Sequence, residues 1–106
     1  MIIAVFLDNM NYKHLDKNMK RVFLFFVRDE IITEIGENFI TVLDIHYLLL
    51  WLINNKVKFI YIDNIDENTK SIIERCDIIV KELKDIKENP LLKALLLKKE
   101  EENNKE

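Results

Sequence analysis

The fold is decided by residues 57–83, VKFIYIDNIDENTKSIIERCDIIVKEL, where the pattern changes from strand to helix and back to strand. Residues 57–62 are rich in β-branched and aromatic side chains, which favour strands. Residues 63–66, Asp-Asn-Ile-Asp, interrupt them, and residues 78–80 form a second apolar run. Between the two runs, helical spacing is kept by Ile65, Thr69, Ile72, Ile73 and Cys76. This order predicts a βαβ unit, whose crossover is almost always right-handed between parallel strands.

The residues before this unit predict three more strands and a helix. Residues 2–7 are apolar without alternation, which is typical of a strand covered on both faces. Residues 21–28 and 31–35 are separated by a two-residue turn and predict a hairpin, which residues 39–42 extend along the same edge. The apolar spacing in residues 44–55 predicts a helix with Asp44 as its N-cap. Its inner apolar stripe consists of Ile45, Leu48, Leu49, Leu52 and Ile53.

A last helix is predicted after Asn89 and Pro90, because proline is common at the first helical position. Placing strand 57–62 beside strand 2–7 gives an α/β fold with a mixed five-stranded sheet of order 3-2-1-4-5. We expect a three-layer α/β/α sandwich with a ribonuclease H-like layout. One domain spans residues 1–97, and the charged residues 98–106 are expected to fray. The predicted core is Ile3, Val5, Ile45, Leu49, Leu52, Phe59, Ile60, Ile62, Ile72, Ile73 and Ile79.

Composition excludes several classes of function. The 106 residues carry a formal net charge of −3 and show no basic stripe, which argues against nucleic-acid binding. A single cysteine, Cys76, excludes an intramolecular disulfide and favours the cytoplasm. The apolar start has no basic leader, and no apolar run approaches the length of a membrane span. A single glycine, Gly36, excludes glycine-rich phosphate loops and dinucleotide fingerprints.

Polar residues gather at one predicted edge of the sheet. The carboxyl ends of strands 2–7 and 57–62 meet there, and ligands of open α/β sheets favour that edge. The predicted helices after residues 43 and 66 also begin there and offer free N–H groups to anions. The edge carries Asp8, Asn9, His14, Asp44, His46, Asp63, Asn64 and Asp66.

These residues have both a chemical and a structural interpretation. Asp8, Asp44 and Asp63 would suit a two-Mg²⁺ nuclease, which would also need a basic surface. The structural alternative is that Asp44 and Asp66 cap helices and that Asp8 and Asp63 end strands, as aspartates commonly do. His14 and His46 would suit iron or zinc, although surface histidines are commoner. Cys76, on the inner side of its predicted helix, fits a small core residue better than a thiolate ligand. We therefore predict no catalytic residues and no enzyme activity.

The layout up to about residue 97 resembles the dinitrogenase iron-molybdenum cofactor biosynthesis family, the small domains of NifX and NafY type. Residues 12–17, Tyr-Lys-His-Leu-Asp-Lys, stand where members carry a Ser-x-His-Phe-Gly-Arg-like motif, and the aromatic strand 22–25 follows. Residues 48–62 match the family's helix followed by a Gly-Val-Asp-Val-Val-Ile-like strand. Residues 77–80 match its Gly-Ile-Lys-Val-like strand.

The resemblance implies a non-catalytic domain that binds an iron-sulfur or iron-molybdenum cofactor precursor and hands it to a protein partner. It makes His14 a metal ligand and adds Asp8, Asn9, Asp63 and Asn64 to the cofactor site. The glycines that members carry after strand 57–62 are replaced here, which favours a second hypothesis, a protein-interaction domain without a ligand.

Helix 44–55 carries two apolar sides. Tyr47, Leu50 and Trp51 lie opposite its main stripe and predict an interface, most simply that of a twofold homodimer. The structural alternative is that the last helix covers these three side chains through Leu91 and Leu95.

Overall fold

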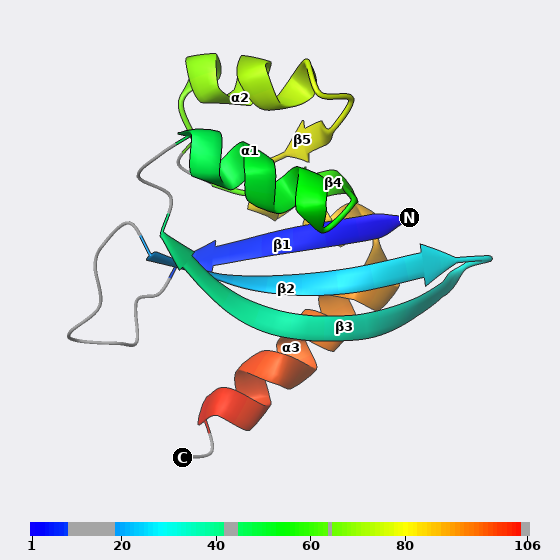
Figure 1. Ribbon diagram of the computed structural model, residues 1–106. Coiled ribbons are helices and arrows are strands. Elements are labelled where there is room, and N and C mark those ends of the chain that lie inside the picture. The colour runs from blue at the N-terminus through cyan, green and yellow to red at the C-terminus, as the bar shows by residue number, and fades with distance from the viewer. Residues whose placement is uncertain (9–18, 42–44, 64, 105–106) are drawn as a thin grey trace.

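A computed structural model of the chain describes residues 1–8, 19–41, 45–63 and 65–104 (Figure 1). The elements are β1 (Ile2–Asp8), β2 (Met19–Arg28), β3 (Ile31–Thr41), α1 (Ile45–Asn54), β4 (Val57–Tyr61), α2 (Glu67–Glu74), β5 (Ile79–Lys81), the 3-10 helix η1 (Leu83–Glu88) and α3 (Pro90–Asn104). No sequence pattern predicted η1.

The five strands form one mixed sheet in the order β3-β2-β1-β4-β5. β2 pairs antiparallel with both β1 and β3, whereas β4 lies parallel to β1 and β5 lies parallel to β4. The predicted α/β class and the predicted strand order are therefore confirmed. The carboxyl ends of the three parallel strands meet at one edge, which we call the strand-end rim.

The two faces of the sheet carry separate apolar cores. α1 and α2 lie on one face, and α3 crosses the other face behind β2 and β3 (Figure 1). The core on the α1 side contains Ala4, Phe6, Val22, Leu24, Ile40, Leu48, Leu52, Val57, Ile60, Ile62, Ile73, Ile78 and Val80. The core on the α3 side contains Ile3, Val5, Phe23, Phe25, Tyr61, Leu92 and Leu96.

Most of the predicted core is buried, with one clear error. Six of its members are buried, namely Ile3, Val5, Leu52, Ile60, Ile62 and Ile73, and four are half-buried, namely Ile45, Leu49, Phe59 and Ile72. Ile79 is 53% exposed, so its assignment to the core was wrong. β5 is a three-residue edge strand. The residues on either side of Ile79, Ile78 and Val80, face the α1 side and are buried. Ile79 faces the other way, on the outermost strand of the sheet.

The outer side of α1 differs from the prediction at Trp51. Tyr47 and Leu50 are exposed, but Trp51 is half-buried and packs edge-on against Phe6, with ring centroids 6.0 Å apart. Ile53, predicted on the inner stripe, is exposed instead. Because α3 lies on the opposite face of the sheet, the idea that it covers Tyr47 and Leu50 was also wrong.

The ends of two helices also differ from expectation. α2 ends at Glu74, so Cys76 lies in the following turn and is exposed rather than on an inner helical stripe. The turn reverses at Asp77, whose φ of 62° is left-handed. α3 runs to Asn104 and so includes most of the segment that was expected to fray, since Lys and Glu are good helix formers.

Candidate functional site

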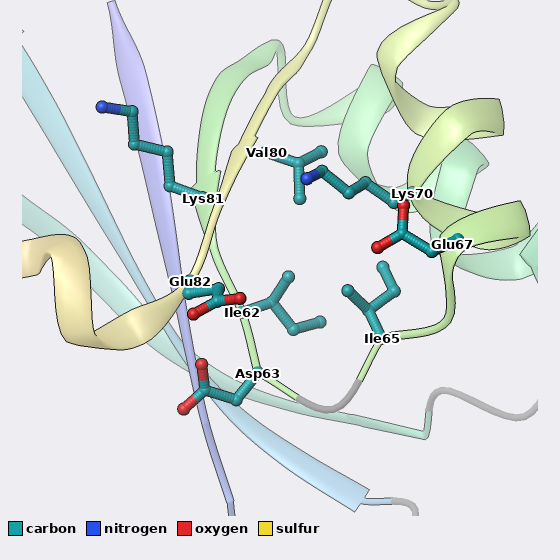
Figure 2. A pocket seen from close by; sticks show the side chains of 8 residues that line it. All are labelled: Ile62, Asp63, Ile65, Glu67, Lys70, Val80, Lys81 and Glu82. Atoms are coloured by element: carbon teal, nitrogen blue, oxygen red, sulfur yellow. The ribbon is translucent and has the colours of Figure 1, made fainter.

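A cavity of about 300 Å³ lies at the strand-end rim, where β4 and β5 end and α2 begins (Figure 2). Its lining consists of Ile62, Asp63, Ile65, Glu67, Lys70, Val80, Lys81 and Glu82. The carboxyl ends of parallel strands are where open α/β sheets bind ligands. The cavity is therefore the candidate site among the described residues.

The floor of the cavity is an extension of the core on the α1 side. Ile62 and Val80 are buried members of that core, and Ile65 packs against it. Neighbouring strands hold the floor in place, because Ile62 N–H donates to the carbonyl of Lys81 at 2.9 Å. The cavity therefore lies directly against the core on the α1 side.

Asp63 forms one end of the cavity and joins two distant segments. Its Oδ1 accepts a hydrogen bond from Leu83 N–H at 2.8 Å, and the carboxylate is half-buried. The bond fixes the loop after β4 to the first residue of η1, whose own N-cap residue, Glu82, makes no side-chain cap. Asp63 thus has a structural role, and in Figure 2 its carboxylate turns toward Glu82 and η1 rather than into the cavity that the residue lines.

Asp66 begins α2 as its N-cap, as one of the sequence interpretations proposed. Its carboxylate accepts from the backbone N–H of Thr69 at 3.2 Å and from the Thr69 hydroxyl. The hydrogen bonds from the Thr69 hydroxyl and N–H hold the pKa of Asp66 below its usual range. This cap sets where α2 starts, and so where Glu67 and Lys70 lie beside the cavity.

We predict that Asp66→Ala lowers the free energy of unfolding at neutral pH. The pKa of Asp66 is lower in the folded chain than in the unfolded chain, so the cap stabilises the fold above the unfolded pKa. The stability difference between wild type and variant should therefore shrink as pH falls through the folded pKa. Urea unfolding of both proteins between pH 7 and pH 3 measures it. A difference that grows on acidification would contradict the role.

Two of the lysines near the cavity are held by ion pairs. Lys81 Nζ lies 2.9 Å from Glu88 and 5.9 Å from the centre of the Phe59 ring, and the hydrogen bond with Glu88 and its charge raise the Lys81 pKa. Lys84 Nζ lies 3.1 Å from Glu82, which raises the Lys84 pKa in the same way. In Figure 2 the Lys81 side chain leads away from the cavity, whereas that of Lys70 reaches into it.

The structure describes only part of the predicted site. Asp63 lies at the cavity. Asp8 is the last residue of β1, and the structure does not describe its side chain. Asn9, His14, Asp44 and Asn64 fall outside the described residues altogether. His46 is exposed in the first turn of α1. Across the described residues, no three His, Cys, Asp or Glu side chains are grouped so as to hold a metal ion.

Sequence reasoning missed the half of the site between β4 and β5. It placed the site between β1 and β4 and gave no role to Lys70, Glu67 or Val80. No local signal marks Lys70, because a lysine in the first turns of a helix is usually solvated.

A scan against protein-family models finds no match, and searches of curated proteins and of solved structures find none either. The likeness to the iron-molybdenum cofactor family thus rests on the order of the elements and on His14. Within the described parts of the chain, no helix is both long enough and apolar enough to cross a membrane.

Proposed function

We propose that this chain is a small non-catalytic domain that binds or carries a metal cluster or its precursor at the strand-end rim and passes it to a protein partner. The observation that carries the proposal is the cavity at the carboxyl ends of β4 and β5, with Asp63 in its lining. The layout shared with the iron-molybdenum cofactor family supports this choice of cargo. Carboxylate oxygen and, by that resemblance, the His14 imidazole are suitable donors for iron.

The proposal includes the architecture and the compartment. Helices on both faces of a sheet of order 3-2-1-4-5 support a three-layer, ribonuclease H-like arrangement. The exposed Cys76 thiol supports a reducing, cytoplasmic setting.

The test is anaerobic reconstitution with iron, sulfide and molybdate, followed by desalting, metal analysis and a visible spectrum. We expect wild type to retain metal and a chromophore, and His14→Ala to retain much less, because one ligand is lost. His46→Ala, which changes an exposed histidine of α1, is the matched control and should behave as wild type. Equal metal content in wild type and His14→Ala would remove His14 from the site. A wild type that retains no metal would refute the proposed cargo.

A second candidate is a protein-interaction domain, favoured by the outer side of α1. Tyr47 is 51% exposed and Leu50 is 60% exposed, and α3 lies on the other face of the sheet. Large apolar side chains grouped on one surface favour an interface.

We predict that wild type self-associates through Tyr47 and Leu50, and that Leu50→Glu is monomeric because a buried, unpaired carboxylate opposes association. Analytical ultracentrifugation from low to high micromolar concentration measures both. Leu97→Glu changes an equally exposed leucine on α3 and is the control. A wild type that stays monomeric throughout, or a control that dissociates as Leu50→Glu does, would contradict the prediction.

A further inference from the structure

β3 forms one edge of the sheet, and among the described residues no strand pairs with its outer side. It is 11 residues long, whereas β5 at the opposite edge has 3 residues. Proteins usually protect a long edge with lysine, proline or a bulge, because its outward backbone groups can pair with a further strand. β3 contains no lysine or proline, and it has one bulge, between Glu34 and Gly36.

The hydrogen bonds of β2 show which residues of β3 direct their backbone outward. Val27 N–H donates to the Met1 carbonyl at 2.8 Å, and the Met1 amino group donates to the Val27 carbonyl at 2.9 Å. Val27 therefore faces β1, and so does every second residue of β2 counted from it, because successive residues of a strand alternate in direction. The partners of these residues on β3 direct their N–H and carbonyl groups away from β2, and they are Ile32, Glu34, Glu37 and Phe39.

The side chains of these four residues lie on the α3 side of the sheet, since their partners on β2 include core residues of that side. Ile32 packs against the core there, and Phe39 is 46% exposed. Glu34 is half-buried, and Glu37 is exposed. An added strand would place its own side chains directly opposite these four. The edge therefore presents the order apolar, acidic, acidic, apolar.

The edge is acidic as a whole. Residues 29–41 contain no lysine or arginine and carry four acidic residues, namely Asp29, Glu30, Glu34 and Glu37. Arg28 lies 3.8 Å from Asp29, and Arg21 lies 3.8 Å from Glu37, so two of the four charges are offset. A carboxylate can accept from several donors at once, so the Arg21 contact leaves Glu37 able to meet a further cation.

A second copy of the chain fits this edge poorly. One antiparallel twofold pairing matches the outward-directed residues of both copies along the strand. In it, Ile32 meets Phe39 of the second copy, and Glu34 meets Glu37 of the second copy. The twofold axis repeats both contacts, so two pairs of glutamates lie directly opposite each other. Like charges in that position destabilise a pair of strands.

We propose that the outer edge of β3 takes up an extended, basic segment of a partner protein as a further strand of the sheet. Backbone hydrogen bonds supply affinity in this mode of binding, and alternate side chains supply specificity. The segment carries lysine or arginine opposite Glu34 and Glu37, flanked by apolar residues opposite Ile32 and Phe39. This inference goes beyond the proposed function and needs no cargo, because β3 and the cavity beside β5 lie at opposite edges of the sheet.

The probe is a peptide with blocked ends, Thr-Ile-Thr-Lys-Thr-Lys-Thr-Ile-Thr, which reads the same in both directions and so tests either strand orientation. Amide hydrogen exchange of the labelled full chain is followed in ¹H–¹⁵N spectra. At a peptide concentration about ten times its dissociation constant, exchange at Ile32 and Glu37 should slow about tenfold, since only the free chain exchanges there. Thr33 and Asn38, which face β2, should change little, and so should Lys70 at the cavity.

Three matched peptides test the contacts. N-methylation of the two lysines removes donors that face β3 when the lysines lie opposite the glutamates, and should abolish binding. N-methylation of the two threonines that flank the lysine pair removes donors on the far side and should leave binding intact. A peptide with glutamate in place of both lysines should bind about fivefold or more weakly.

One variant and its control test the charge on the chain. Glu34→Gln should narrow the difference in affinity between the lysine and glutamate peptides, because it removes one of the two charges that distinguish them. Glu74→Gln makes the same change at an exposed position on α2 and should leave that difference as in wild type. The unchanged amide signals of β1 report that both variants are folded.

The inference is overturned if the lysine peptide leaves exchange at Ile32 and Glu37 unchanged, if the glutamate peptide binds as tightly, or if methylation of the lysines leaves binding intact. Slow exchange at these two amides without peptide also overturns it. Protection that rises with protein concentration would mean that a second copy covers the edge, and constant protection would mean that the chain covers it itself. Metal retention after reconstitution is a separate measurement, so failure of the proposed function is distinguishable from failure of this inference.

Discussion

Replacing Ile60 by alanine is expected to lower the free energy of unfolding by about 2–5 kcal/mol, as for other truncations of buried isoleucine. Ile60 is fully buried in β4, the strand that lies between β1 and β5. It pairs with Ala4 on one side and with Val80 on the other. The missing atoms would leave a void at the centre of the core on the α1 side, because strands on both sides limit collapse.

Ile79→Ala is the matched control for this measurement. It removes the same atoms from the neighbouring strand β5, where the side chain is 53% exposed, and should cost under about 1 kcal/mol. Urea unfolding of the three proteins under one set of conditions gives both differences. Equal losses for the two variants would mean that β4 is not the central parallel strand.

Replacing Trp51 by alanine is expected to cost about 2–3 kcal/mol, somewhat less than for a fully buried tryptophan. Trp51 is half-buried against the core on the α1 side, and its ring meets that of Phe6 at an interplanar angle of 76°. Edge-to-face ring pairs add to the apolar area that such a side chain buries. Loss of the ring should loosen α1 from β1.

Leu50→Ala changes the adjacent residue of α1 and is the control. Leu50 is 60% exposed, so its truncation should change stability by no more than about 0.5 kcal/mol in a monomer. Both variants are compared by urea unfolding at low protein concentration, where self-association does not contribute. A small effect for Trp51→Ala would mean that Trp51 belongs to the exposed surface with Tyr47 and Leu50, as predicted from the sequence.

The strands and their order were predictable because their signals are local and strong. A continuous apolar run marks β1, and a run of β-branched and aromatic residues interrupted only by Lys58 marks β4. The short turn at Asp29 and Glu30 allows only a hairpin between β2 and β3. The rule for parallel crossovers then leaves few arrangements for the remaining strands. The order 3-2-1-4-5 followed from these constraints.

The end of α2 was not predictable, because the usual signal is missing. Helices commonly end before a glycine with left-handed backbone, but here Asp77 takes that conformation, with φ 62°. Without a glycine to mark the end, Cys76 was read as helical. η1 was missed for a different reason, since its first N–H is satisfied by Asp63, which is distant in the sequence.

Among the described residues, Asp63 is the one member of the predicted cofactor site that lies at the cavity. Asp63 was found because it ends a parallel strand, and the topology brings such ends together. Lys70 was not found, since a lysine on a helix is usually solvated, and its half-buried position depends on how α2 packs over β5. The half-buried position of Trp51 depends likewise on Phe6 of β1, far away in the sequence.

The central claim, that the strand-end rim is the ligand site, is tested most directly by locating the bound ligand. The measurement is the ¹H–¹⁵N spectrum of the anaerobically reconstituted chain compared with that of the untreated chain. We predict that amide signals shift or broaden at Ile62, Asp63, Glu67, Lys70 and Leu83, and stay unchanged at the hairpin turn of Asp29 and Glu30. Changes at that turn would contradict the claim, and so would changes at α3 with none at the strand-end rim.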